Sequence, residues 1–506
     1  MPTYGQLSAT HPSHDDARLR EYRALASGGH VLLGDDALMA RVFPQHAHEP
    51  AWVYAERKRR AIYLPYAGEI VGELCAQLGA DPLVARAEPS ADSFFEQFVD
   101  DIDRRGTSLS VFAQALVRTA LVDRIAWTLV DLPAIPGDEP QSLAEQERSG
   151  GLRAYLCPLD ASAVTDWEED EQGALTWACV RSIRATRSGP ADDRSDVVER
   201  FTVYYPDRWE RYELSYKAGR SPRAKTDVPM LAQGAHTFGS VPLVRLELPE
   251  GLWALDKLAP VARAHLNLCS AIDWSQNKHL FPMMMAFLAP DDAGGAAGGD
   301  PARATQQTYG TGWINTFGKD DRIEYVAPDT GVYEHALGRL SSLRDEMHRV
   351  CHAMALAVDN SAGAMGRSGE SKAEDRAAKE VVIRELGRLA RDTVRRALVL
   401  AQRGRGDEVS LWNVSGFERF DPGDEAEAIT AALAADSLEI PSPTFRQIFL
   451  TATAQRIVRR HATPEQLVAI RDELEQWADE QRAEPSDSRV AATPAQVPAE
   501  RATRSS

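Results

Sequence analysis

The residues whose types and spacing come nearest to a metal site are His348, Cys351 and His352, which share one face of a predicted helix. Imidazole and thiolate groups so placed could bind a transition metal. No fourth ligand is evident in the sequence, so we interpret the three residues as ordinary helix-packing positions. His46 and His48 could also pair as ligands, but they fall in a polar stretch that we expect to be a solvated loop.

Carboxylates and glycines suggest two further chemistries. Asp166, Glu168 and Glu169 could act as a general acid and base, but such groups must be held in a cleft, and nothing in the sequence indicates one. We therefore expect a solvated turn before a strand. The glycines between Gly294 and Gly299 lack a following Lys-Ser or Lys-Thr pair, which argues against a phosphate-binding loop. The sequence thus predicts no catalytic residue, no metal site and no cofactor.

The overall charge limits how this chain could meet DNA. A net charge of -18 repels DNA over most of the surface and argues against a repressor-like or histone-like binder. A conduit for DNA is still compatible with this charge. DNA has to slide through a conduit, and a protein that made many phosphate contacts would hold the duplex in place. We find no run of the roughly 18 apolar residues that a membrane helix needs and no signal peptide, so we expect a cytoplasmic start and no membrane contact.

The five cysteines predict no disulfide framework and no metal site. They are odd in number, far apart in the sequence and include no CxxC pair, so we expect reduced core residues. They are Cys75, Cys157, Cys179, Cys269 and Cys351.

The elements that would position any site follow from periodicity and composition. We expect an α+β fold in which a loosely ordered arm (1–45) precedes a mixed α+β region (46–254). Leu258, Val261, Leu268 and Ile272 follow a 3-4 spacing that predicts a long helix over 255–281, with Pro260 tolerated in or near its first turn. Short strands are expected within 282–329, a second long helix over 330–357, a third over 371–404, a strand and shorter helices over 405–481, and a disordered tail over 482–506.

One segment between the second and third predicted long helices has few residues that could pack in a hydrophobic core. Residues 358–370, VDNSAGAMGRSGE, are small, polar and glycine-bearing, so they can bury few apolar groups. On the helix that follows, five arginines alternate with acidic residues, which favours a solvated or intersubunit ion-pair face over a DNA-binding face. These arginines are Arg384, Arg388, Arg391, Arg395 and Arg396.

This order of elements resembles the portal proteins of tailed bacteriophages, in particular a portal-like family formerly catalogued as a domain of unknown function. The resemblance covers about residues 50 to 460 and lies in the ordered combination of segments. They include YAERKRRAIYLPYAGEIVGEL, the segment from Gly106 to Pro133 that ends in TLVDLP, SVPLVRLEL followed by LDKLAPVARAHLNLCSAIDWSQNKHLF, and VSLWNVSGFERF followed by EIPSPTFRQIF.

The resemblance implies a wing (46–254), two stem helices (255–281 and 330–357), a small β clip between them (282–329), a tunnel loop (358–370), a long helix (371–404), and a wing return with a helical crown (405–481). It implies a ring of about twelve copies at one capsid vertex, assembled in the host bacterial cytoplasm and retained in the virion, through which double-stranded DNA is packaged and ejected. The implied partners are the terminase large subunit, head-completion and tail connector proteins, and the major capsid and scaffold proteins.

Under that resemblance, the tunnel loop and the start of the next helix would approach the DNA, with Arg367 and Lys372 nearest to the phosphates. The residues expected to line the channel are Asn360, Ser361, Gly363, Met365, Gly366, Arg367, Ser368, Gly369 and Lys372. Such a ring is a structural protein and not an enzyme. Two alternatives stay open: a metal-dependent hydrolase or nuclease, for which the 75 acidic residues would have to converge on a metal, and another structural minor head protein.

Overall fold

The computed structural model describes residues 1–88, 93–132, 154–186, 196–217, 219–279, 283–287, 322–326, 330–358, 371–405 and 411–418, with a few single residues between 449 and 476. The chain divides into two units, Met1–Phe420 and Asp421–Ser506, and the helices and strands described below belong to the first. The predicted helices of residues 421–481 and the predicted tail lie outside the continuously described residues.

The expectation of a loosely ordered arm over residues 1–45 is wrong. Four short helices occupy it: α1 (Tyr4–Leu7), α2 (Asp16–Ser27), α3 (Gly29–Leu33) and α4 (Asp36–Val42). Asp15 and Asp35 accept hydrogen bonds from the first free N–H groups of α2 and α4, as N-cap residues do. Leu25, Met39 and Phe43 are fully buried in the main core. Each helix is too short for a sustained period, and only α2 and α4 carry an aspartate N-cap as a local signal.

Helices α5 (Ala51–Arg59), α6 (Tyr66–Gly79), α7 (Ser93–Asp100) and α8 (Leu109–Asp123) continue the main core. The sequence predicted one or two helices over residues 51–79, and two are present. Helix α8 leads directly into β2 (Ile125–Asp131), as the apolar run IAWTLVD predicted. The turn between them uses Arg124, whose φ of 72° is in the region that side chains rarely adopt.

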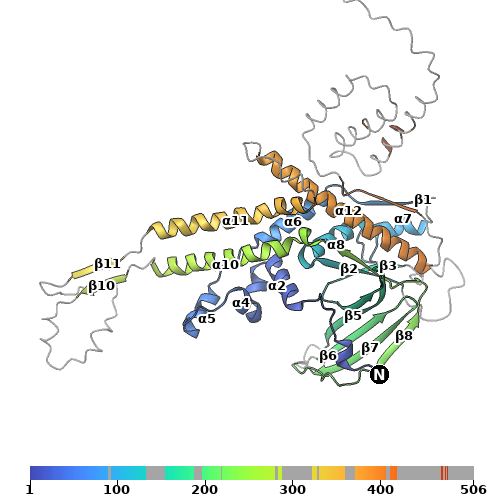
Figure 1. The fold of residues 1–506 in the computed structure, drawn as a ribbon, viewed down its shortest axis with the longest axis horizontal. Coiled ribbons are helices and arrows are strands. Elements are labelled where there is room, and N and C mark those ends of the chain that lie inside the picture. The colour runs from blue at the N-terminus through green and yellow to red at the C-terminus, as the bar shows by residue number, and fades with distance from the viewer. Residues whose placement is uncertain are drawn as a thin grey trace, which may run out of the picture. The chain divides into compact units, whose positions relative to one another are not determined.

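The two larger antiparallel sheets among the described residues have three and five strands (Figure 1), and two further strand pairs are given below. The first has the order β3-β2-β9, with β3 at Tyr155–Leu159 and β9 at Leu243–Glu247. The second runs β4-β5-β6-β7-β8, with bounds Val164–Glu169, Leu175–Thr186, Asp196–Tyr204, Arg208–Lys217 and Met230–Ala235. Residues 166–169, expected to form a solvated turn, are therefore part of strand β4. A small apolar cluster that includes Trp127 and Trp167 joins the two sheets.

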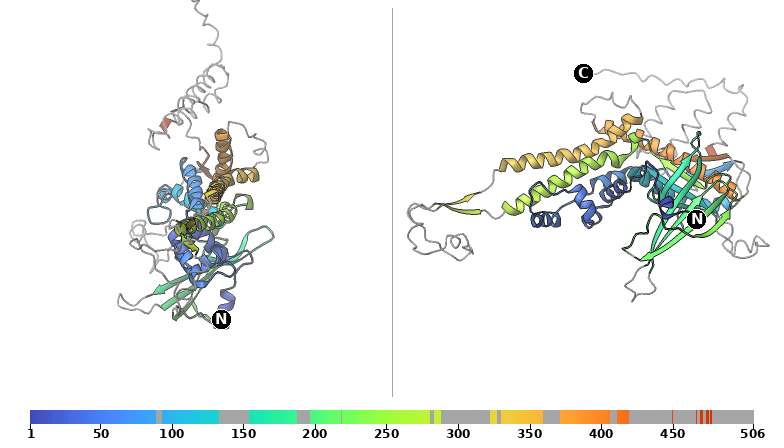
Figure 2. Two further views of the ribbon diagram at one scale, coloured as in Figure 1. Left: turned by 90° about the vertical axis from the view of Figure 1, so that its left-hand side faces the viewer. Right: turned by 60° about the horizontal axis from the view of Figure 1, so that its bottom comes forward.

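Beyond the short 3-10 helix η1 (Glu250–Leu252), the chain forms α10 (Ala254–His279), the antiparallel pair β10 (Met283–Phe287) and β11 (Arg322–Val326), and then α11 (Thr330–Val358). At 1.5 Å per residue, the two helices are about 39 and 44 Å long. They pack against each other along the chain's projecting arm (Figure 1 and Figure 2, right), and the β10–β11 pair lies at their outer ends. Pro260 lies in the second turn of α10, one turn later than predicted.

Helix α12 (Ser371–Arg405) lies across the core and is followed by β12 (Leu411–Ser415), which pairs with β1 (Val84–Glu88). Residues more than 320 positions apart in the sequence thus meet in one small sheet, with Ala87 opposite Trp412. The α+β class predicted from the sequence is confirmed. None of the helices within the described ranges has the length and apolar run that a membrane crossing needs.

Candidate functional site

The predicted channel loop falls largely outside the described residues. Asn360, Ser361, Gly363, Met365, Gly366, Arg367, Ser368 and Gly369 are not described, and Lys372 belongs to α12 although its side chain is not described. The structure therefore does not test whether these residues come together. It does describe the two helices that hold the ends of this segment.

Both of these helices are anchored in the core close to the segment between them. Met354 and Ala355, near the end of α11, are fully buried, as are Val382 and Ile383 in the second quarter of α12. Helices α11 and α12 contact each other, and all four residues belong to the main apolar cluster. Residues 359–370 thus connect two stiff elements whose positions are fixed by packing.

The arm is asymmetric about its two helices. Helix α10 contacts α2, α6 and α8 as well as α11, whereas α11 contacts α6, α12 and η1 in addition to α10. Side chains tie α10 to the elements behind it: Asn267 donates to the Val42 carbonyl at 2.8 Å, and the Ser270 hydroxyl accepts from the Ile62 N–H at 3.1 Å. At the outer end, the Ser275 and Tyr333 hydroxyls are 2.8 Å apart.

The predicted apolar seam of α11 is buried only over its inner half. Leu343, Met347 and Val350 are at most 7% exposed, whereas Leu337 is 49% exposed. Val332, in the first turn of the helix, is 67% exposed. The outer half of the arm consequently presents apolar side chains that this chain does not cover with described residues. The outer half would be a weakly stabilised helical pair in a lone subunit.

The basic face of α12 is neutralised within the chain. Arg384 pairs with Glu380, and Arg388 pairs with Glu385 and Asp392. Three further arginines of this helix bind elsewhere in the chain: Arg391 and Arg395 donate to backbone carbonyls at or after β12, and Arg396 donates to the Arg245 carbonyl. The preference for an ion-pair face over a DNA-binding face is therefore supported by the geometry.

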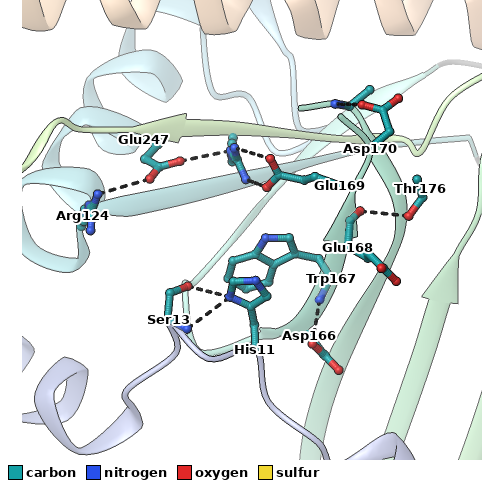
Figure 3. A network of polar contacts seen from close by, with 12 residues as sticks. His11, Ser13, Arg124, Asp166, Trp167, Glu168, Glu169, Asp170, Thr176 and Glu247 are labelled. Carbon is teal, nitrogen blue, oxygen red and sulfur yellow. Dashed lines mark hydrogen bonds and ion pairs between the residues drawn. The ribbon is translucent and has the colours of Figure 1, made fainter. Parts of the chain in front are cut away.

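The carboxylates of β4 also have structural partners (Figure 3). Glu169 forms a bidentate ion pair with Arg245 of β9, which also contacts Glu247 at 3.2 Å. The hydrogen bonds from Arg245 hold the pKa of Glu169 below its usual value, so the carboxylate stays ionised. Such a group stabilises the contact between the two sheets and is a poor proton donor near neutral pH.

The stretch before α2 also packs on β4. The imidazole of His11 is stacked on the indole of Trp167 with ring centroids 4.0 Å apart, and its Nδ1 atom lies 2.7 Å from the Ser13 hydroxyl (Figure 3). No local pattern predicts this contact, because the two residues are far apart in the sequence and neither belongs to a motif. The contact fixes the N-terminal residues against the sheet.

The histidines and cysteines that were considered as metal ligands form no cluster among the described side chains. His348 is exposed on α11, and the side chains of Cys351 and His352 are not described. Within the described ranges, no three His, Cys, Asp or Glu residues lie close enough together to hold a metal ion. Cys75 and Cys179 are buried free thiols whose pKa is raised to about 11 by burial.

Cys157 and Cys269 are only partly buried, so the expectation of core positions holds for two of the four described cysteines. Both half-buried thiols nevertheless have a pKa raised by burial, which keeps them protonated near neutral pH.

Comparisons with known proteins give weak similarities. No family model matches the sequence, and no curated protein matches it. A chain of the solved structure titled "Virion of native gene transfer agent (GTA) particle" is 14% identical, with a TM-score of 0.40 over 85% of this chain and 98% of that chain. A chain from "Neck of empty GTA particle computed with C6 symmetry" is 13% identical, with a TM-score of 0.39 over 81% of this chain and 97% of that chain.

Proposed function

We propose that this protein is a portal protein of a tailed-phage-type particle. It would form a ring of about twelve copies at one capsid vertex, through which double-stranded DNA is packaged and ejected. The observation that carries the proposal is the order and packing of elements in this chain. An α+β region leads into two long helices joined at their outer ends by a β pair, and the second helix passes through a short polar segment into a third long helix.

A ring would bury apolar surface that the arm exposes in a single subunit. A projecting two-helix arm with exposed Val332 and Leu337 buries little apolar surface as a lone subunit, whereas the same arms packed side by side around an axis would cover each other. The β10–β11 pair at the outer end would then face the terminase during packaging and the head-completion or tail connector proteins afterwards. The major capsid and scaffold proteins would surround the wing.

In this ring, the segment 358–370 would project into the bore and guide DNA without catalysis. Arg367 and Lys372, repeated in each subunit, would supply a sparse belt of positive charge that centres the duplex. The acidic remainder of the chain would limit adhesion, because each neutralised phosphate adds affinity and slows sliding. The ATP hydrolysis that drives packaging would come from the terminase.

Imaging the purified full-length protein tests the proposal directly. Negative-stain electron microscopy should show a ring with a central hole, and light scattering should give a mass near twelve times 55.6 kDa. A protein that stays monomeric, or that forms closed assemblies without a hole, at micromolar concentration in low and in physiological salt would rule out the portal assignment. It would then favour another minor head protein.

A metal-dependent nuclease is the alternative from a different class. It requires carboxylates that converge on a metal ion. Glu169 of β4 and Glu385 of α12 are instead paired with arginines. Cleavage of duplex DNA by the purified protein in Mg²⁺ or Mn²⁺, abolished by a chelator, would favour this alternative.

A further inference from the structure

The sheet edges of this chain differ in whether another element occupies them. The outer edge of an end strand presents unpaired N–H and C=O groups that can pair with a further strand. Leaving the β10–β11 pair aside, the described sheets have six end strands. In four of these strands, a backbone group is hydrogen-bonded to another element, through that element's backbone or through an arginine side chain. The bonds are His11 N–H to Thr165 on β4, Leu156 N–H of β3 to Ile102, Arg396 to the Arg245 carbonyl on β9, and Arg395 to the Trp412 carbonyl on β12.

Strand β8 has no such cover in the part of the chain that the structure describes. The His236 N–H, just after β8, donates to the Asp207 carbonyl at 3.0 Å and so points toward β7. Because the backbone groups of successive residues alternate in direction, those of Ala235 and Gln233 point away from β7. No described residue outside β7 forms a backbone hydrogen bond with either of them.

The composition of β8 also leaves its edge unprotected. Natural edge strands are usually guarded by charged residues or proline, and β4 carries Asp166, Glu168 and Glu169. From residue 228 to residue 244 the chain contains no Asp, Glu, Lys or Arg, although a quarter of all its residues are charged. Met230 and Leu231 are 42% and 53% exposed. Strand β8 is therefore a neutral, partly apolar edge in an acidic protein.

Strand β1 is the second open edge. It pairs with β12 on one side, and none of the backbone groups of residues 84–88 bonds to a further element within the described ranges. Val84 is 44% exposed, and Arg86 is exposed as well. Strand β1 has five residues and β8 has six, so the two edges match in length.

We propose that β1 of one copy pairs with β8 of the next copy in the assembled particle, so that the subunits share a continuous β-sheet. This inference rests on the proposed ring. A cyclic assembly of more than two copies needs two different surfaces that complement each other on the same chain. The two open edges, which lie on separate sheets, supply such a pair. The backbone hydrogen bonds would give the affinity, and the neutral character of β8 lets it accept a strand with the exposed Arg86 without like-charge repulsion.

Cysteine cross-linking tests the pairing in the full-length chain. One population carries Arg86→Cys, and a second carries Leu231→Cys, Gln233→Cys or Ala235→Cys, which cover the registers within reach. After mixing and mild oxidation, at least one combination should give a disulfide-linked dimer on a non-reducing gel, while the wild type and each population alone should not. A dimer formed by a β8 variant alone would replace the proposal with β8–β8 pairing, and no dimer in any combination would overturn it.

Edge-blocking substitutions supply an independent measurement. Leu231→Lys places a charge on the open edge, and Gln233→Pro removes an N–H that points away from β7. Each should weaken self-association by about tenfold or more, measured by light scattering across a dilution series. Ile183→Lys is the matched control, because Ile183 is 55% exposed on the inner strand β5 and has no open edge.

The outcomes separate this inference from the proposed function. If the wild type forms rings and both edge variants form them equally well, with unchanged circular dichroism, the strand pairing is wrong and the portal assignment stands. If the wild type forms no ring but the mixed cysteine variants still cross-link, the strand pairing stands and the portal assignment fails. Absence of both the ring and the cross-link overturns both.

Discussion

At the scale of single residues, several side chains that could have carried out chemistry form structural contacts in the fold. The acidic run at 166–169 is evident in the sequence, but its partner Arg245 lies 76 residues beyond Glu169, and no local pattern connects them. The same holds for His11 and Trp167. Residue types can therefore suggest chemistry, whereas the partners that decide between catalysis and structure depend on long-range packing.

One buried residue makes stability depend on pH. His265 on α10 is 3% exposed, its Nδ1 atom has no hydrogen-bond partner among the described residues, and its ring lies edge-on to Tyr66. Burial, and to a smaller extent the charge of Arg344, lowers its pKa below the usual 6.5. As the pH falls below 6.5, the unfolded chain takes up a proton that the folded chain resists, so folding stability is lost by at most about 1.4 kcal/mol per pH unit.

The prediction is checked by urea unfolding at pH 7.5 and pH 5.5. His265→Phe keeps an aromatic ring against Tyr66 and removes the titrating group, so it should lose less stability between the two pH values than the wild type does. His335→Phe, at an exposed position on α11, serves as the matched control. Equal losses in His265→Phe and the wild type would show that the buried imidazole does not titrate differently in the two states.

At the scale of elements, the sequence predicted the helices whose apolar residues repeat at a regular spacing over several turns. The 3-4 spacing of Leu343, Met347 and Val350 runs over several turns, and helix α11 is present where that spacing predicted it. Helices α1 to α4 were missed because each spans at most 12 residues and because the Pro, His, Gly and acidic residues of this stretch suggested a loosely ordered arm. Strand β4 was missed because its charged residues suggested a turn, although Trp167 between them is buried. The pairing of β1 with β12 had no local signal at all.

A glycine on α12 shows how closely two elements approach. A Cβ added at Gly387 would collide with the backbone carbonyl of Phe417, just after β12. Gly387→Ala should therefore destabilise the fold by about 1 to 3 kcal/mol, since backbone cannot move aside as a flexible side chain can. Gly338→Ala on α11, where a Cβ would meet nothing within 4 Å, should instead stabilise the fold by about 0.5 to 1 kcal/mol.

Urea unfolding followed by circular dichroism measures both glycine changes. The changes in the free energy of unfolding should have opposite signs in the two variants. A general preference of helices for alanine would instead stabilise both. If Gly387→Ala were as stable as Gly338→Ala, α12 and the segment after β12 would not be in close contact.

At the scale of the whole molecule, charge and architecture together constrain the function. The chain is acidic overall, its most arginine-rich described helix is internally paired, and its projecting arm leaves apolar side chains uncovered. A DNA-binding protein of the adhesive type would need the reverse distribution, with unpaired cations gathered on one face. A ring whose bore carries few cations per subunit is consistent with all three properties.

The last prediction concerns those few cations in the assembled particle. Arg367→Ala combined with Lys372→Ala should reduce the packaging rate and the length of packaged DNA, because the duplex would no longer be centred by positive charge in the bore. The matched control is Arg208→Ala combined with Lys217→Ala, which removes two basic residues from strand β7 of the wing. Both variants should assemble rings of wild-type mass. If both package DNA like the wild type, the segment 358–370 does not act on DNA through its charge, and guidance of the duplex would have to come from the helices of the arm.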